Sequence, residues 1–148
     1  MSTTKINKLE IAISQLQHAI TLFLEERELI SAITLAGAAE EILGKLVTQA
    51  GLVSAVIRRT ENARSLHKYL WKSDAGFKEI VNIKNKTRNE LKHLVSGTPI
   101  EVNLEEETMR LLNRAVENYR LLHVQAAPFI RDYERQRLVL WRKRSGHS

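Results

Sequence analysis

Arg88, Asn89 and His93 combine the residue types and the spacing that chemistry on a phosphodiester requires. A guanidinium neutralises phosphate oxygens, an amide orients them, and an imidazole, with an unperturbed pKa of about 6.5, can move a proton at neutral pH. On a helix Asn89 and His93 lie at i and i+4 and share a face, whereas Arg88 lies about 140° from His93 around the axis. This offset predicts that residues from elsewhere in the protein complete the site.

The spacing Arg-Asn-x3-His resembles the signature of the HEPN family, small all-helical domains of which many are metal-independent ribonucleases. Residues 35–43 are similar to the small-residue, acidic second helix of many of these proteins. Residues 114–119 are similar to a segment that follows the motif in some of them. The resemblance spans roughly residues 5–125 and does not extend to the C-terminal residues.

The resemblance implies a reaction in which the RNA 2′-hydroxyl attacks the adjacent phosphorus and leaves a cyclic phosphate, without a metal or other cofactor. It implies catalytic roles for Arg88, Asn89 and His93, with His93 as general acid or base. Because the reaction uses both a base and an acid and one chain supplies one motif histidine, it also implies a homodimer. The resulting hypothesis is an endoribonuclease that acts on RNA as a toxin or defence component, with an antitoxin as a partner.

A different interpretation remains open for the same residues. His93 also fits an exposed position near a helix C-terminus, where positive charge is favourable, and Arg88 taken alone is typical of a protein surface. On this interpretation the protein is a catalytically silent helical adaptor, or a subunit that partners a nucleotidyltransferase. The two hypotheses differ in whether Arg88, Asn89 and His93 converge on an open cleft.

Glu90 and His93 have the Glu-x-x-His spacing of di-iron helical bundles. Such a site needs a second Glu-x-x-His unit and two further glutamates. No other Glu-x-x-His occurs in the sequence, so we predict no metal site.

The elements that must position the motif are helices. Apolar residues recur at steps of three and four over about residues 4–26, and a second helix, 27–50, is apolar on more than one side and is the predicted centre of the fold. Its small residues, 36–39, would let another helix approach closely. Glu40 and Glu41 lie on this helix, and one of them must point inward or toward an interface, where a carboxylate demands a partner such as Arg88 or a lysine. Glu40 is the candidate that would support the site.

The remaining chain predicts three more helical segments. Residues 51–76 are less regular and predict only a short helix that starts near residue 62 or 65, with Tyr69 and Trp71 assigned to the core in preference to stacking on bases. The motif helix is predicted over 77–95. Asn103 and Glu106 have capping-box spacing before the next helix.

Pro128 should break or kink the chain after that helix. We therefore predict an all-α fold, an up-and-down bundle of four to five helices over residues 1–127, resembling HEPN domains, with a helical extension over 128–148.

Composition and charge restrict the class of protein. The 148 residues suffice for one domain, contain no cysteine, and include neither a signal-peptide core nor an apolar run of membrane-spanning length, so we expect a cytoplasmic protein without membrane contact. The net charge is +6, of which residues 129–148 carry +4. This basic segment is compatible with RNA binding but is more typical of a solvated helix end. The candidate RNA-binding residues are Lys84, Lys86, Lys92, Arg131 and Arg135.

Overall fold

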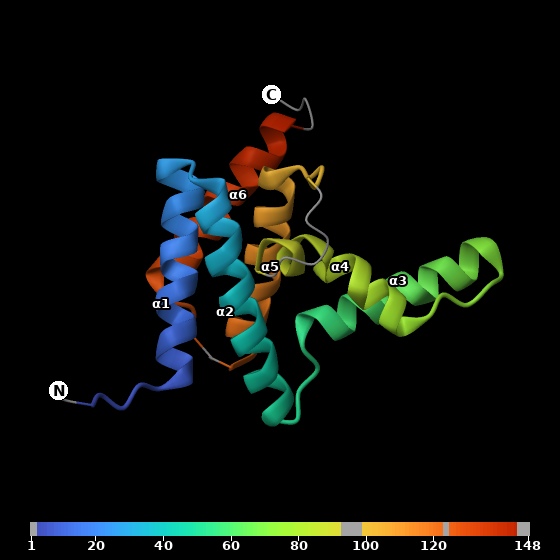
Figure 1. Ribbon diagram of the computed structural model, residues 1–148, viewed down its shortest axis with the longest axis horizontal. Helices are drawn as coiled ribbons and strands as arrows, with labels where there is room; N and C mark the ends of the chain where they lie inside the picture. Colours follow the sequence, from blue (N-terminus) through green and yellow to red (C-terminus); the bar gives the residue numbers. More distant parts are fainter. Residues whose placement is uncertain (1–2, 93–98, 123–124, 145–148) are drawn as a thin grey trace.

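The computed structural model describes residues 3–92, 99–122 and 125–144, and this part of the chain is helical and contains no strand (Figure 1). The predicted all-α class is confirmed. Among these residues no helix is both long and apolar enough to cross a membrane. The elements are α1 (Lys8–Thr21), the π-helical turn η1 (Leu22–Glu26), α2 (Leu29–Gln49), α3 (Ala55–Trp71), α4 (Phe77–Lys92), α5 (Leu104–Leu122) and α6 (Pro128–Arg144).

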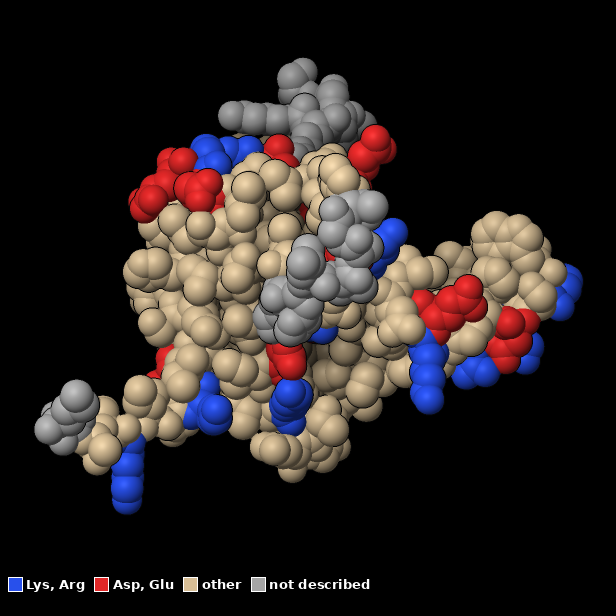
Figure 2. Space-filling model, in the orientation of Figure 1, with Lys and Arg blue, Asp and Glu red and all other residues tan. Residues whose placement is uncertain are grey.

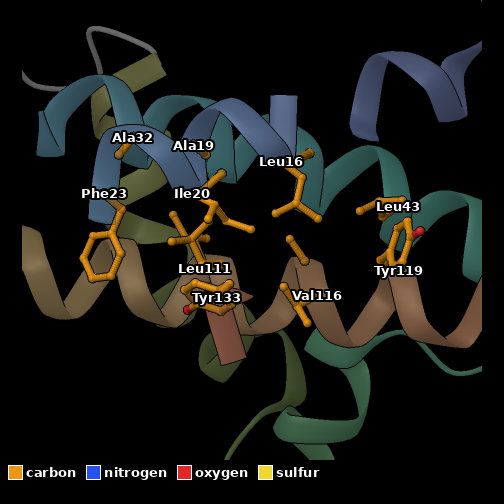
Figure 3. Close-up of a cluster of buried hydrophobic side chains, with 14 of the residues drawn as sticks. Leu16, Ala19, Ile20, Phe23, Ala32, Leu43, Leu111, Val116, Tyr119 and Tyr133 are labelled. Carbon is orange, nitrogen blue, oxygen red and sulfur yellow. The ribbon is translucent and has the colours of Figure 1, made fainter. Parts of the chain in front are cut away.

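Helices α1, α2, α5 and α6 surround one apolar core, and α2 lies between α1 and α5 (Figure 1). Figure 3 shows Leu16 and Ile20 of α1 facing Leu111 of α5, with Tyr133 of α6 beside them. The predicted central position of the second helix is confirmed, because α2 buries residues along most of its length. These residues are Ala32, Ile33, Ala36, Gly37, Ala39, Glu40, Leu43 and Val47.

Two asparagine side chains set the starts of α1 and α5. Asn7 Oδ1 accepts a hydrogen bond from the Leu9 N–H at 2.9 Å, so α1 begins at Lys8 and not near residue 4. Asn103 Oδ1 accepts from the Glu106 N–H at 3.1 Å, which confirms the predicted cap of the helix after the motif.

Helix α3 is longer than the sequence predicts, because it starts at residue 55 and not near 62. The Ser54 side chain makes no capping hydrogen bond. Instead, the buried Oδ1 of Asn118 on α5 accepts from the Ala55 N–H at 2.8 Å. The first turn of α3 is therefore capped by a residue that is distant in sequence.

Helices α3 and α4 pair with each other and project from the bundle (Figure 1). We call residues 55–92 the α3–α4 arm; it contacts the body through α2 and α5. Tyr69 is 73% exposed and Trp71 65% exposed, so the prediction that they lie in the core is wrong. The fold is thus an all-helical bundle in which four helices surround the core and two form an arm.

Helix α6 begins at Pro128, the residue predicted to interrupt the chain. Proline suits the first turn of a helix because its missing N–H needs no partner there. Ile130 and Tyr133 are fully buried among residues of α1, α2 and α5. The segment predicted as an extension therefore supplies part of the core.

Candidate active site

Helix α4 approaches α2 where α2 carries its small residues, and Arg88 fills the contact. A Cβ atom on Gly37 would lie only 2.8 Å from Arg88 Cγ and 2.9 Å from Arg88 Cδ. Only glycine leaves room for the stem of this arginine in its present position. The predicted close approach at residues 36–39 is confirmed, and the element that approaches is the motif helix.

Glu40 lies about one turn further along α2 and receives the Arg88 guanidinium. The Glu40 side chain is 3% exposed, and its Oε2 accepts a hydrogen bond from Arg88 NH1 at 3.0 Å. A carboxylate buried to this degree is tolerated only with such partners. Of the two carboxylates of which one was predicted to point inward, it is Glu40 that does so, and of the partners predicted for it, it is Arg88 that pairs with it.

Arg114 of α5, which was not among the predicted site residues, is a second partner of Glu40. Arg114 NH2 lies 3.1 Å from Glu40 Oε2 and donates to Asn85 Oδ1 at 2.9 Å. Its Nε and NH1 atoms are buried and have no hydrogen-bond partner among the described residues. The spacing of Arg114 along α5 could have predicted this role. Arg114 lies between Leu111 and Asn118 on the buried stripe of the helix, where a cation requires a carboxylate.

The cluster of Glu40, Arg88 and Arg114 contains two guanidiniums and one carboxylate, so it is positively charged. Burial is the main cause that lowers the pKa of Arg114; the Glu40 carboxylate opposes this effect, and Arg110 and Arg88 add to it. Burial also lowers the pKa of Lys84 on α4, and neighbouring arginines lower it further. This concentration of cations creates a potential that attracts an anion.

One edge of the Arg88 guanidinium is only weakly engaged. Its Nε and NH2 atoms both lie 3.4 Å from Asn89 Oδ1, longer than the usual range of about 2.7–3.2 Å. This edge is the fork with which an arginine binds two oxygens of a phosphate side by side. Asn89 is exposed, so this edge of Arg88 lies beside a side chain that solvent reaches.

A cleft of about 500 Å³ opens beside this cluster, between α2, the start of α3 and α4. Arg88 lines it, whereas Asn89 does not. His93 lies outside the described residues, so the structure does not place the predicted imidazole relative to the cleft. The other lining residues are mostly polar: Glu40, Glu41, Gly44, Lys45, Thr48, Gln49, Ser54, Val56 and Asn85.

The five candidate RNA-binding residues are separated by the fold. Lys84 is half-buried and shares a face of α4 with Arg88 at i and i+4. Lys86 is exposed and lines a separate hollow with Thr87, and the side chain of Lys92 lies outside the described residues. The two on α6, Arg131 and Arg135, are exposed.

No family model, curated protein or solved structure matches this chain. Within the part of the chain that the structure describes, no three histidine, aspartate or glutamate side chains gather closely enough to hold a metal ion. The features that define the molecule are its all-helical fold and a motif arginine that a buried carboxylate holds at a polar cleft.

Proposed function

We propose that this protein is a metal-independent endoribonuclease of the HEPN type, with its active site at the edge of Arg88 that faces Asn89, next to the cleft. The observation that carries the proposal is the held guanidinium. Glu40 fixes Arg88 through NH1, and the Nε–NH2 edge is left for two phosphoryl oxygens. A cation fixed before the reaction needs little reorganisation when negative charge develops in the transition state.

In the proposed reaction the RNA 2′-oxygen forms a bond to phosphorus while the bond from phosphorus to the 5′-oxygen breaks. The 2′-hydroxyl proton passes to a base and the 5′-oxygen takes a proton from an acid, which gives a 2′,3′-cyclic phosphate and a 5′-hydroxyl. Arg88 stabilises the charge on the non-bridging oxygens, Asn89 orients them, and His93 moves one proton. His93 of a second copy moves the other, so the functional unit is a two-fold homodimer.

The charge of the site supports RNA as the substrate. One carboxylate faces two guanidiniums in the cluster, and a backbone phosphate supplies the missing negative charge. Lys84 adds a cation on the same face of α4 as Arg88. An enzyme that cuts RNA in this way suits a toxin or defence component restrained by an antitoxin.

RNA cleavage in EDTA tests the proposed chemistry through His93→Ala. The matched control is His18→Ala, because His18 is exposed on α1, which does not line the cleft. Wild type and the control should leave 2′,3′-cyclic ends, whereas His93→Ala should lose roughly 10²–10⁴-fold in rate, as expected for a general acid or base. Cleavage that requires a divalent metal, or that His93→Ala leaves unchanged, contradicts the proposal.

Substitution of Arg88 tests the held guanidinium. Arg88→Ala should abolish most of the activity, and Arg88→Lys should retain only part of it because an ammonium lacks the two-pronged edge. Arg120→Ala is the control, since Arg120 is an exposed arginine of α5 paired with Glu134. Full activity of Arg88→Lys would show that the fork plays no part.

A catalytically silent helical adaptor, or a subunit that partners a nucleotidyltransferase, is the second candidate, and one observation favours it. Arg88 already pairs with a buried carboxylate, and such a pair can serve folding alone. On this alternative no variant cleaves RNA, and Arg88→Ala mainly lowers the free energy of unfolding. A folded but inactive Arg88→Ala protein beside an active wild type contradicts it.

A further inference from the structure

The α3–α4 arm exposes large apolar side chains that the bundle does not cover. Leu66 is 57%, Leu70 53%, Trp71 65% and Ile83 68% exposed, and all four line one groove of about 540 Å³. We call these four residues the arm groove. Monomeric proteins rarely leave a continuous apolar patch of this extent without a binding role.

The apolar area of the arm groove matches one side of a protein interface. The four exposed fractions sum to an area of roughly 500 Å², given about 150–250 Å² for a large side chain. A standard interface covers about 800 Å² per partner, of which about 56–65% is apolar, that is roughly 450–520 Å². The arm groove alone therefore supplies the apolar part of a half-interface.

The charges around the arm groove favour a second copy of this chain as the occupant. Residues 61–83 contain four basic and three acidic residues, a net charge of +1, although the whole chain carries +6. Figure 2 shows both signs side by side along the projecting arm. Two identical copies of this surface repel each other little and can pair opposite charges across a two-fold axis.

RNA fits the same surface less well. Four leucine and isoleucine side chains line the groove, and aliphatic side chains do not stack on bases. The two rings of the groove, His67 and Trp71, already contact each other with their centroids 5.0 Å apart. Arg64, a cation beside the groove, is already paired with Asp74 at 2.7 Å. The groove therefore resembles the core of a protein interface more than a nucleic-acid surface.

We propose that the arm groove is the interface through which two copies of this chain dimerise, with the two α3–α4 arms packed as a four-helix bundle and Trp71 as a central anchor. This interface proposal rests on the proposed function in one respect: both require that two copies of the chain associate. Ile83 of the groove precedes Arg88 by five residues on α4, or about 7.5 Å along the helix axis. Pairing the arms thus brings the two motif helices toward each other.

Sedimentation velocity of the full chain from about 1 to about 100 µM tests the interface, because interfaces of this size dissociate at micromolar concentrations or below. The test variant is Leu66→Glu with Ile83→Glu, and the control is Ile30→Glu, since Ile30 is 55% exposed on α2. Wild type and control should be dimers, and the double variant should raise the dissociation constant roughly 100-fold or more, as for loss of interface anchors. Circular dichroism should show both variants folded, because the substituted side chains are exposed.

The outcomes separate this inference from the proposed function. A dimer that the double variant alone disrupts, in a protein that cleaves no RNA, supports the interface and overturns the ribonuclease. RNA cleavage by a dimer that survives the double substitution supports the ribonuclease and overturns the interface. RNA cleavage by a monomer overturns the interface and also the two-chain active site. A monomeric wild type whose RNA binding weakens in the double variant would assign the groove to RNA and overturn the inference.

Discussion

At the scale of single residues, Glu40 is the group on which the arrangement of the site depends. One oxygen of this α2 side chain accepts a hydrogen bond from Arg88 of α4 and forms an ion pair with Arg114 of α5, so a single carboxylate connects three helices. A buried ion pair contributes little compared with apolar residues of the same size, but removal of one member leaves an uncompensated charge. If Glu40 is removed, the positive charges of Arg88 and Arg114 lie close together with no carboxylate between them.

We expect Glu40→Gln to lower the free energy of unfolding by about 3–5 kcal/mol, because both guanidiniums lose their counter-charge in a buried place. Urea unfolding at pH 7 measures this change. The matched control is Glu41→Gln: Glu41 is partly exposed and paired with Lys45 at i and i+4, so its loss should change stability by less than about 1 kcal/mol. Equal, small effects in both variants would show that Glu40 is not buried as an ion.

At the scale of elements, the contact between α2 and α4 depends on Gly37. Alanine favours a helix over glycine by roughly 0.5–1 kcal/mol, so Gly37→Ala would ordinarily stabilise α2. Here the new Cβ would meet Arg88 Cγ and Cδ. The two effects have opposite signs, and a double-mutant cycle can separate them.

We expect Gly37→Ala to destabilise the wild type and to displace Arg88 from Glu40, with a loss of any RNA cleavage. In an Arg88→Ala background the clashing atoms are gone, so the same substitution should stabilise the protein by roughly 0.5–1 kcal/mol, the intrinsic helix preference. Urea unfolding of the four proteins provides the cycle. The same effect in both backgrounds would mean that Arg88 does not cross Gly37.

Local patterns in the sequence were sufficient for most elements. The apolar periodicity of α1 and α2, the cap at Asn103 and the break at Pro128 are all short-range signals, and the structure confirms them. The start of α3 could not be predicted, because its cap, Asn118, comes from another helix. Which charged groups meet in the interior is also set by how helices pack and not by local pattern.

The candidate site, too, was predicted only as far as local sequence determines it. An inward carboxylate at Glu40 or Glu41 with a partner such as Arg88 or a lysine could be predicted, because a buried carboxylate demands a cation. Which carboxylate and which cation meet is set by how α2 and α4 pack. Arg114 was missed because nothing local marks it as a partner of a residue on α2. The role of His93 still rests on the sequence pattern alone.

At the scale of the whole molecule, Tyr133 links the C-terminal helix to the stability of the core. Its hydroxyl donates to Asn113 Oδ1 at 2.9 Å, and burial raises the pKa of Tyr133 well above its ordinary value, an effect that Arg137 and Arg59 partly oppose. The folded protein therefore keeps the phenolic proton at pH values where the unfolded chain loses it. Above about pH 10 the unfolded state binds fewer protons, so stability falls as the pH rises.

We expect the free energy of unfolding to be independent of this group below about pH 10 and to decrease between about pH 10 and pH 11.5. Tyr133→Phe should lose about 1 kcal/mol at pH 7 with its hydrogen bond but should show a smaller alkaline decrease than the wild type. Urea unfolding of the wild type and the variant at pH 7 measures the loss of the hydrogen bond, and the same measurement at about pH 10 and pH 11.5 gives the alkaline decrease. An identical alkaline decrease in the variant would indicate that the titrating group is another residue.

The core packs early helices against helices that are synthesised late, α5 and then α6 with its buried Ile130 and Tyr133. This sets an order of events while the chain is made on the ribosome. Helices α1 and α2 emerge first and can pair early, but the surface of α2 that α5 covers stays open until residues near Leu111 and Leu112 follow, about 60 residues after α2 ends. At about 5–20 residues per second this takes roughly 3–12 seconds, and α6 arrives later still. During that interval the nascent chain presents an apolar helical surface, so translation speed and chaperone access should influence how much of the protein reaches its folded state.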